Sequence, residues 1–472
     1  MKDFDLIVLG GGSAGYAAAR TASSLGLRVA VVEGGAEVGG LCILRGCMPS
    51  KALIESANRC LAVRGAGDFG LEVGPPTVLP EAIHARKARH VAEFADYRAK
   101  QLESGRFAFI RGWAGFVDPH TVEIRAADGT LQRLTGETFL LATGSRTQVL
   151  ALPGLAEAGY LDSDGVLAQA RVPRSVAILG GGPTAVEFAH YYAALGTQVT
   201  LIQRSEQVLK EMDGDVAHAL TEAFRKRGVH VYCHTELLRV QPGRAGGKEV
   251  VFTQAGKTRT VEVEEIVCAL GRVPQLKGLG LSNAGLETTQ GRLAVSATQQ
   301  TAVPHLFAAG DVAGPYEVVH IAIQQGELAA RNAARLVQES QGKGSRTLEE
   351  MDYRLRLAVV FTEPEIAVVG VSERELQGEG VPYRVASYPF GDLGKAILME
   401  ETAGFVKLLA NEESGEIVGG AVVGPRASDL IHEIVVAMRF RSTARQLAEI
   451  PHYHPTLSEI WTYPAEELAE GM

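Results

Sequence analysis

The chain has 472 residues, of which 46% are hydrophobic and 21% are charged, so it is too long for one typical core and should form three or four domains. Its formal net charge of −9 and the lack of a Lys/Arg run disfavour binding to nucleic acid or to an anionic membrane. No stretch approaches the roughly 20 apolar residues that span a bilayer, and no signal-peptide pattern opens the chain, so we expect a cytoplasmic protein.

The first predicted elements form a strand–turn–helix–strand unit. Phe4–Leu9 is an apolar strand, a glycine-rich turn leads into an Ala-rich helix that ends near Leu25, and a second strand over residues 28–32 ends at Glu33. Such glycines allow a tight turn and let the backbone approach a pyrophosphate at the positive end of the helix. The glycines predicted to do so are Gly10, Gly12 and Gly15. One such pattern is weak evidence, because glycine-rich turns are common in α/β proteins.

Two cysteines follow this unit in the segment Gly39–Lys51, at Cys42 and Cys47. Pro49 precedes a predicted helix over residues 50–59, which places Cys47 at or near a helix N-terminus, where a thiolate is favoured. A cysteine pair that opens and closes is what electron transfer to a disulfide needs. The alternatives are two buried cysteines or half of a metal site. The neighbouring sequence lacks further zinc ligands, so no metal is expected.

The strand–turn–helix–strand pattern occurs again further along the chain. A strand over Val176–Leu179 leads to a turn containing Gly180 and Gly182, a helix, and a second strand that ends at Gln203, in the position of Glu33. The two copies align without a gap. Two copies in the same register predict two bound nucleotides. The three cysteines outside the pair are expected to pack in the core: Cys60, Cys233 and Cys268.

Two other apolar strands run into turns, at Phe139–Gly144 and Leu306–Asp311. Each alone would be an ordinary buried strand, but their order relative to the two repeats argues against that interpretation. A linker is predicted at residues 339–350. Beyond it lies an α/β unit without a nucleotide signature, with strands at 355–362, 405–409 and 417–423 and helices at 427–439 and 464–469.

A second chemical group is predicted near the end of the chain. Thiol–disulfide exchange needs a side chain that takes a proton near neutral pH and returns it, and imidazole is suited to this. His454 is followed by Pro455, and Glu459 lies five residues after the histidine. We expect the chain to fold back there so that the carboxylate fixes the tautomer of the ring.

These residues together resemble a known family. The pattern GGxCxxxGCxPSK over residues 39–51 is similar to the redox-active segment of class I pyridine nucleotide-disulfide oxidoreductases. The similarity covers essentially the whole chain, in the order of the family. It includes both glycine turns, Ala142-Thr143-Gly144, Gly271-Arg272-x-Pro274, Asp311 and the His-Pro-Thr-x-x-Glu that begins at His454.

The resemblance implies an α/β fold with two dinucleotide-binding Rossmann-like domains, for FAD and NAD(P), and a C-terminal α/β dimerisation domain. The implied domains are a first FAD-binding part at 1–150, an NAD(P)-binding domain at 151–272, a second FAD-binding and central part at 273–345, and the dimerisation domain at 346–472. The implied assembly is an obligate homodimer with shared active sites, in which the histidine reaches the cysteines of the other subunit.

The resemblance also implies roles for single residues. Cys42 attacks the substrate, Cys47 lies against the flavin, and His454 with Glu459 handles protons. Glu33 holds the adenosine ribose of FAD and Asp311 its ribityl chain, while Lys51 lies near the isoalloxazine with Glu187 beside it. The implied cofactor-binding residues are Gly10, Gly12, Gly15, Glu33, Lys51, Ala114, Thr143, Gly144, Gly180, Gly182, Glu187, Gln203, Arg204, Lys210, Gly271 and Asp311.

The sequence points to two different members of the family. The redox segment, with Tyr16 and His452, is most similar to dihydrolipoyl dehydrogenase, which implies a small dithiol or disulfide substrate such as the lipoyl group of a carrier protein. Gln203, Arg204 and Lys210 instead resemble reductases that use NADPH, in which cations meet the 2′-phosphate. The cations could equally be surface charges, so the nucleotide is NADP or NAD.

Two alternative functions and the role of Arg45 therefore remain open from the sequence. The chain could be an NADPH-dependent reductase of a low-molecular-weight disulfide such as glutathione disulfide, or a flavoprotein subunit of a larger complex. Arg45, which replaces a residue usual in the redox segment, could bias the site toward an anionic substrate or point to solvent.

Overall fold

The computed structural model describes residues 2–343 and 347–470, so part of the predicted linker lies outside the described residues. Contacts along the chain divide it into two compact units, and each is built from separate segments. The first unit contains Met1–Ala52, Ala85–Gln148 and Arg272–Asp352, and the second contains Leu53–His84, Val149–Gly271 and Tyr353–Met472.

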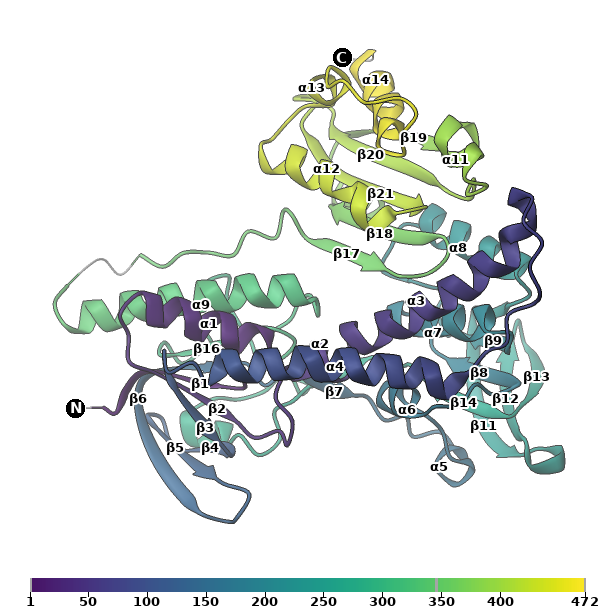
Figure 1. Ribbon diagram of the computed structural model, residues 1–472. Helices are drawn as coiled ribbons and strands as arrows, with labels where there is room; N and C mark the ends of the chain where they lie inside the picture. Colours follow the sequence, from purple (N-terminus) through teal and green to yellow (C-terminus); the bar gives the residue numbers. More distant parts are fainter. Residues whose placement is uncertain (1, 344–346, 471–472) are drawn as a thin grey trace. The chain divides into compact units, whose positions relative to one another are not determined.

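The first unit is organised around a parallel sheet (Figure 1). The sheet has the order β3-β2-β1-β6, and β16 pairs with the other edge of β6. The N-terminal half of β6 also pairs with the antiparallel strand β5, which in turn pairs with β4. The strands are β1 Phe4–Leu9, β2 Val29–Glu33, β3 Ala108–Arg111, β4 Trp113–Asp118, β5 Thr121–Arg125, β6 Leu131–Leu141 and β16 Leu306–Ala308.

Alternating side chains of this sheet enter two different cores. Leu6 and Val8 of β1 pack on one face with the alanines of α1 (Ser13–Ser24) and α9 (Val319–Ser340), while Ile7 and Leu9 pack on the other face with Phe139. Helices α1 and α9 lie side by side on the first face (Figure 1). Successive strand residues point to opposite faces, so a fully apolar strand such as β1 is covered on both sides.

The second repeat forms the parallel sheet of the second unit, in the order β10-β9-β8-β14. Helix α7 (Pro183–Ala194) joins β8 to β9, as α1 joins β1 to β2, so the predicted repeat is confirmed. An antiparallel sheet, β11-β12-β13, follows α8 (Gly214–Lys226) and was not predicted. The strands are β8 Ser175–Leu179, β9 Gln198–Ile202, β10 His230–Tyr232, β11 Thr235–Pro242, β12 Lys248–Gln254, β13 Lys257–Val263 and β14 Glu265–Cys268.

The C-terminal part of the second unit is an antiparallel sheet with helices packed on it, in the order β17-β18-β21-β20-β19. Helix α12 (Ala427–Arg439) packs against β18 and β21, and its Ile431 and Ile434 enter a core that also holds Trp461. The strands are β17 Leu357–Val360, β18 Glu365–Gly370, β19 Tyr383–Pro389, β20 Phe405–Asn411 and β21 Ile417–Gly424. The predicted α/β fold class, with two repeated parallel-sheet parts and a C-terminal α/β part, is confirmed.

The redox segment and the residues after it form helices α2 (Gly40–Leu44) and α3 (Cys47–Arg64), and the long helix α4 (Pro80–Leu102) was not predicted. Strands β7 (Ser145–Thr147) and β15 (Arg272–Pro274) form an antiparallel pair. The remaining helices are α5 Leu155–Ala158, α6 Ser163–Ala168, α10 Glu373–Glu379, α11 Gly394–Leu398, α13 Ala444–Ala448 and α14 Thr462–Glu470.

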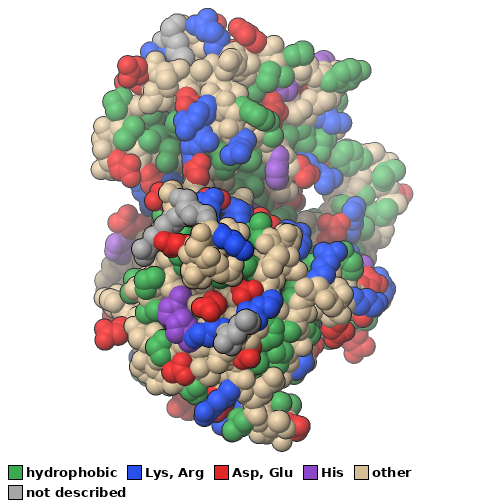
Figure 2. All heavy atoms as spheres, turned by 90° about the vertical axis from the view of Figure 1, so that its left-hand side faces the viewer, with side chains coloured by type: hydrophobic (Ala, Val, Ile, Leu, Met, Phe, Trp, Pro, Cys, Tyr) green, Lys and Arg blue, Asp and Glu red, His purple; other side chains and the backbone are tan. Residues whose placement is uncertain are grey.

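Figure 2 shows acidic and basic side chains interspersed over one face of the molecule. This mixture agrees with the modest negative net charge, because neither sign gathers into a continuous field on that face. Among the helices that the structure describes, none is both long enough and apolar enough to cross a bilayer.

Candidate active site

The first glycine turn leaves room for an anion at the start of α1. A side chain at Gly10, whose φ is +109°, would place its Cβ 2.4 Å from the carbonyl oxygen of Ala142, and one at Gly15 would lie 1.8 Å from that of Gly10. Gly12 precedes the helix, and no side chain caps the helix N–H groups there. The turn therefore presents backbone donors at the positive end of a helix, which fits the pyrophosphate of a dinucleotide.

Glu33 closes this turn from the end of β2. One carboxylate oxygen accepts from the Gly11 N–H at 2.9 Å, and the other accepts from the Gly35 N–H at 2.8 Å. The half-buried carboxylate is thereby held at the carboxyl edge of the parallel sheet, where nucleotides bind in such folds. Ala114, another predicted contact, is half-buried on β4 opposite Ile124.

The turn after β6 carries two predicted residues, Thr143 and Gly144. The Thr143 hydroxyl donates to the carbonyl of Gln275 at 2.7 Å, and Gly144, with φ of +68°, accepts from the Gln275 N–H at 2.9 Å. A left-handed backbone is accessible to glycine without steric cost. These bonds join the turn to the segment after β15.

Asp311 follows β16, as predicted, and its carboxylate accepts from the Ser145 hydroxyl at 2.6 Å. Ser145 in turn accepts from the Arg272 guanidinium at 2.7 Å. The fully buried amide of Gln325 fixes the adjacent backbone, because its oxygen accepts from the Gly310 N–H at 2.8 Å and its nitrogen donates to the Gly314 carbonyl at 2.7 Å. Ser145 and Gln325 were missed in the sequence, where the signal for Gln325 is a polar residue on the buried face of α9.

The structure brings Cys42 and Cys47 together, with a hydrogen bond between their side chains. Cys42 lies on α2, and Cys47 is the first residue of α3, as predicted. Between them, Gly46 packs so closely that a Cβ there would lie 3.0 Å from the Leu41 carbonyl oxygen. The hydrogen bond to Cys47, burial and the charge of Cys47 raise the pKa of Cys42. Loss of a first proton by the pair therefore makes loss of the second proton harder.

The other cysteines are packed as predicted for core residues. Cys60 and Cys268 are buried, and Cys233 is half-buried against a hydrophobic cluster. Burial raises the pKa of Cys268 to about 12. A thiol that stays protonated at neutral pH is a poor nucleophile.

Lys51 and Glu187 are placed on different helices. Lys51 is half-buried one turn after Cys47 on α3, and its charge lowers the pKa of Cys42 against the larger effect of the hydrogen bond. Glu187 is buried on α7 and accepts from the Phe361 N–H at 3.1 Å. Their predicted position at the isoalloxazine stays a prediction.

The second glycine turn repeats the geometry of the first. Gly180 has φ of +119°, and a Cβ there would lie 2.3 Å from the Ala269 carbonyl oxygen. Gly182 precedes α7 without a side-chain cap, so the first turn of that helix also presents backbone donors. Gly271, with φ of +99°, follows β14 at the same edge of the sheet.

The polar side chains that follow β9 differ in how exposed they are and in whether they already have a partner. The buried side chain of Gln203 accepts from the Arg204 N–H at 3.1 Å, and its amide nitrogen lies 3.4 Å from the Gln207 carbonyl. Arg204 is exposed and forms no ion pair within the described part of the chain. Lys210 is exposed too, but its amine lies 3.1 Å from Glu211. Arg204 is thus the cation better placed to meet a phosphate.

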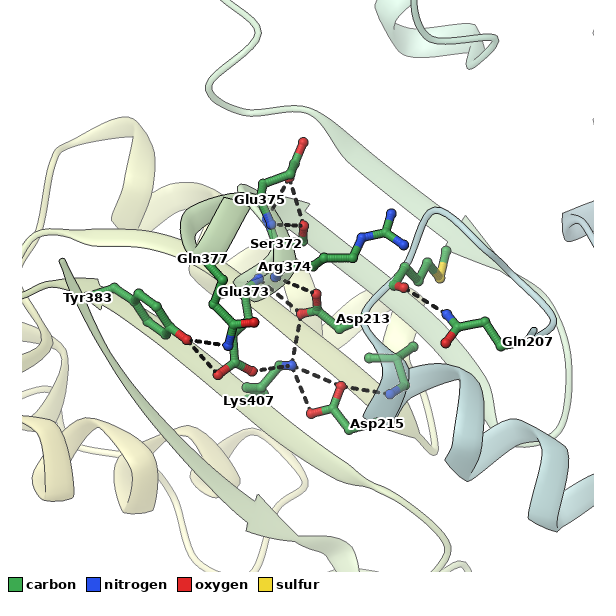
Figure 3. A network of polar contacts seen from close by, with 12 residues as sticks. Gln207, Asp213, Asp215, Ser372, Glu373, Arg374, Glu375, Gln377, Tyr383 and Lys407 are labelled. Carbon is green, nitrogen blue, oxygen red and sulfur yellow. Dashed lines mark hydrogen bonds and ion pairs between the residues drawn. The ribbon is translucent and has the colours of Figure 1, made fainter. Parts of the chain in front are cut away.

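A buried lysine anchors the end of this nucleotide loop (residues 203–213) within the second unit (Figure 3). Lys407 is only 3% exposed in the middle of β20, and its amine bonds to Asp213 at 2.8 Å, Asp215 at 2.8 Å and Glu373 at 3.2 Å. Asp213 immediately precedes α8. The sequence signal that was missed is a lone charge inside the apolar strand Phe405–Leu409.

Arg374 reinforces this anchor at the start of α10. Its guanidinium donates to the Lys210 carbonyl at 2.7 Å, and its backbone N–H donates to Asp213 at 3.0 Å. One residue before Lys210, the Leu209 N–H donates to the Gly181 carbonyl at 2.7 Å. The loop is therefore tied both to the second glycine turn and to the C-terminal part.

The charges of this network stabilise the fold between two pH limits. Burial alone would lower the pKa of Lys407 and raise that of Asp213, but the hydrogen bonds and opposite charges of the network together outweigh burial, which holds the pKa of Lys407 above its ordinary value and that of Asp213 below its ordinary value. Because the pKa of Lys407 is raised, its contribution to folding stability is lost as pH rises past the ordinary pKa of lysine. Because the pKa of Asp213 is lowered, its contribution is lost as pH falls below the ordinary pKa of aspartate.

We therefore expect Lys407→Met to lower the free energy of unfolding by about 3–5 kcal/mol near neutral pH, because the change leaves a buried carboxylate without its partner. Denaturant unfolding of the holoenzyme measures this. The loss should shrink below about pH 4, where Asp213 is protonated in the variant. The matched control is Lys100→Met, which removes an exposed pair with Asp96 and should change little. Equal stability of the two variants would contradict the assignment.

His454 and Glu459 are in contact, as the prediction requires. Nδ1 of His454 lies 2.9 Å from Oε2 of Glu459, whose other oxygen accepts from the Thr456 N–H at 3.3 Å. Because a carboxylate only accepts, Nδ1 carries the proton and Nε2 is left for proton transfer. The histidine side chain is 77% exposed while the glutamate is buried. His452 is buried instead, with Nε2 2.6 Å from Glu433 on α12.

The exposed histidine lies in a region with exposed apolar side chains. Tyr453 is 81% exposed and Phe440, at the end of α12, is 77% exposed. The contact of His452 with Glu433 ties the histidine segment to that helix. Exposed aromatic groups on a folded surface are typical of a protein interface.

Comparisons with known proteins agree with this arrangement. The family model described as pyridine nucleotide-disulphide oxidoreductase matches residues 4–326, and the one described as its dimerisation domain matches residues 357–465. The chain is 33% identical to the dihydrolipoyl dehydrogenase of Chlamydia muridarum over 467 residues, which is 98% of this chain and 96% of the relative. It is also 33% identical to that of Geobacillus stearothermophilus over 469 residues, covering 99% and 96%.

A solved structure shows the same similarity. The crystal structure of LpdA from Mycobacterium tuberculosis superposes with a TM-score of 0.87 at 31% identity, covering 98% of this chain and 99% of that one. The likeness therefore extends over both units and the C-terminal sheet.

Proposed function

Because this chain belongs to the pyridine nucleotide-disulphide oxidoreductase family, we propose that it acts on a small dithiol or disulfide of the lipoyl type through Cys42 and Cys47. It is an FAD-dependent oxidoreductase that moves electrons between a nicotinamide nucleotide and a disulfide, and it forms a homodimer. The observation that carries the proposal is the hydrogen-bonded thiol pair at the start of α3, in the same unit as the first glycine turn and the Asp311 turn.

Bound FAD supplies the two-electron link between nicotinamide and thiols. To reduce a disulfide, His454 takes the proton of Cys42, whose thiolate attacks one substrate sulfur. The substrate S–S bond breaks, and its second sulfur leaves and takes the proton from the histidine. The Cys47 thiolate then attacks Cys42, which forms the Cys42–Cys47 disulfide and releases the first sulfur as a thiolate that takes a second proton from water. One substrate disulfide becomes two thiols as the enzyme pair is oxidised, and the reverse sequence oxidises a dithiol.

We further propose that each active site is shared between two subunits. The support is the exposure of His454 and its position beside exposed aromatic side chains, in a region that matches the dimerisation domain. An acid/base group needs a site with controlled solvent access, and a second copy of the chain would cover it.

Steady-state assays test the proposed substrate. We expect purified enzyme to carry about one FAD per chain and to reduce lipoamide with NADH or NADPH far faster than glutathione disulfide. Activity on glutathione disulfide alone would favour the alternative reductase. A preparation that holds FAD but reduces neither disulfide would contradict the proposal, and the flavoprotein-subunit alternative would remain.

We propose that NADPH serves at least as well as NADH. Arg204→Ala should raise the KM for NADPH about ten- to hundredfold and leave the KM for NADH nearly unchanged, because a guanidinium–phosphate hydrogen bond is lost. Gln203→Glu should shift preference toward NADH by accepting from the ribose and repelling the phosphate. Lys210→Ala is the matched control, since that amine is already paired. A wild-type preference for NADH that is insensitive to Arg204→Ala would show these residues to be surface charges.

A further inference from the structure

Arg98, near the C-terminal end of α4, is half-buried, and within the described residues no acidic side chain forms an ion pair with it. Its Nε and Nη1 atoms are inaccessible to solvent and have no hydrogen-bond partner among residues 2–343 and 347–470. Its guanidinium carbon lies 4.3 Å from the centre of the Tyr16 ring, which is a cation–π contact. Burial lowers the pKa of Arg98, although arginine remains charged in proteins.

The packing of α1 and α2 brings this charge close to Cys42. Gly40, at the start of α2, lies so near the first glycine turn that a Cβ there would be 2.6 Å from the Cα of Gly12. Tyr16 is one helical turn further along α1, and its N–H donates to the Gly12 carbonyl at 2.9 Å. The hydrogen bond to Cys47 raises the pKa of Cys42 most, and the positive charge of Arg98 opposes that rise.

Removing a cation of this kind from water costs free energy. Desolvation of an ion costs several kcal/mol unless hydrogen bonds and an opposite charge compensate it, and the Tyr16 ring supplies only part of that compensation. The charge of Arg98 acts on Cys42, and the packing of Tyr16, Gly12 and Gly40 connects the two, so these donors face the part of the site where the proposed mechanism places the substrate. An anion bound there would complete their hydrogen bonding.

Arg45, the arginine that the sequence placed in the redox segment, does not fill this role. Its side chain is 57% exposed and lies 3.5 Å from the equally exposed Glu37. An exposed charge is screened by water and contributes little to binding. The half-buried arginine beside the cysteines comes instead from α4, about 50 residues further along the chain.

We propose that Arg98 forms an anion-binding subsite beside Cys42 and that the preferred disulfide carries a carboxylate bound by this guanidinium. The inference rests on the proposed function and narrows its substrate class. Lipoate and lipoamide have the same dithiolane ring and differ only in a terminal carboxylate or carboxamide, so the ratio of their kcat/KM values isolates the contribution of the charge.

The test compares both substrates in wild type, Arg98→Met and Arg98→Lys. Arg98→Met should lower kcat/KM for lipoate about ten- to hundredfold and leave the value for lipoamide little changed, since one charge-assisted bond is lost. Arg98→Lys should retain part of the lipoate activity, because it keeps the charge but not the planar donors. The matched control is Arg20→Met, which removes a nearby cation already paired with Glu327 and should leave the ratio unchanged.

Two outcomes would contradict the proposed anion-binding subsite. An equal loss with both substrates would show that Arg98 serves only the reactivity of Cys42, and no loss with either would show that it binds no substrate group. FAD content and lipoamide reduction by Arg98→Met report whether the variant folds. If wild type reduces neither lipoate nor lipoamide, the proposed function itself fails, and that result is distinct from a failure of the subsite.

Discussion

Cys42→Ser is expected to abolish disulfide turnover and to leave intact the long-wavelength absorbance that a Cys47 thiolate produces beside oxidised FAD. The structure supports this division of roles, because Cys47 begins α3, where the helix dipole stabilises an anion, and the hydrogen bond to Cys47 raises the pKa of Cys42. Cys47→Ser should lose both the band and the activity. The measurements are anaerobic titration by two electrons, followed by absorbance, and steady-state lipoamide reduction.

The control for these variants is Cys233→Ser, which removes a half-buried thiol outside the pair and should retain both properties. Identical spectra for Cys42→Ser and Cys47→Ser would mean that the two roles have been assigned wrongly. The FAD content of each variant is measured separately, because loss of FAD would indicate a damaged fold.

His454→Gln is expected to slow disulfide turnover by about 10²-fold or more, the usual contribution of a positioned acid/base group. Reduction of the enzyme by NAD(P)H should remain fast, since that half-reaction does not use this imidazole. Stopped-flow reduction and steady-state turnover separate the two. His452→Gln is a close control, because it removes a buried histidine that also contacts a glutamate but has no free ring nitrogen.

A shared site also predicts complementation. Inactive Cys42→Ser subunits mixed with inactive His454→Gln subunits should regain partial activity, because a mixed dimer contains one site with an intact thiol pair and an intact histidine. Absence of recovery, when subunit exchange has been demonstrated with labelled chains, would place the whole site within one chain.

Local patterns in the sequence predicted the parts of the site that short stretches of chain determine. Both strand–turn–helix–strand units were predicted because apolar strands, positive-φ glycines and helix starts are encoded by neighbouring residues. The position of Cys47 at a helix start and the contact of His454 with Glu459 were predicted for the same reason. The antiparallel strands β11–β13 and the helix α4 were missed, because their polar faces obscure the periodicity.

Only the tertiary structure decided which distant charges meet. Lys407 bonds to Asp213 across 194 residues, and neither residue stands in a motif. The sequence drew attention to Arg45, which the fold leaves in solvent, whereas Arg98 is carried by α4 onto the ring of Tyr16. Sequence periodicity shows which face of an element is apolar. The partner of a buried charge, however, depends on how whole elements pack. That packing is specific because burying an unpaired ion costs several kcal/mol of folding free energy.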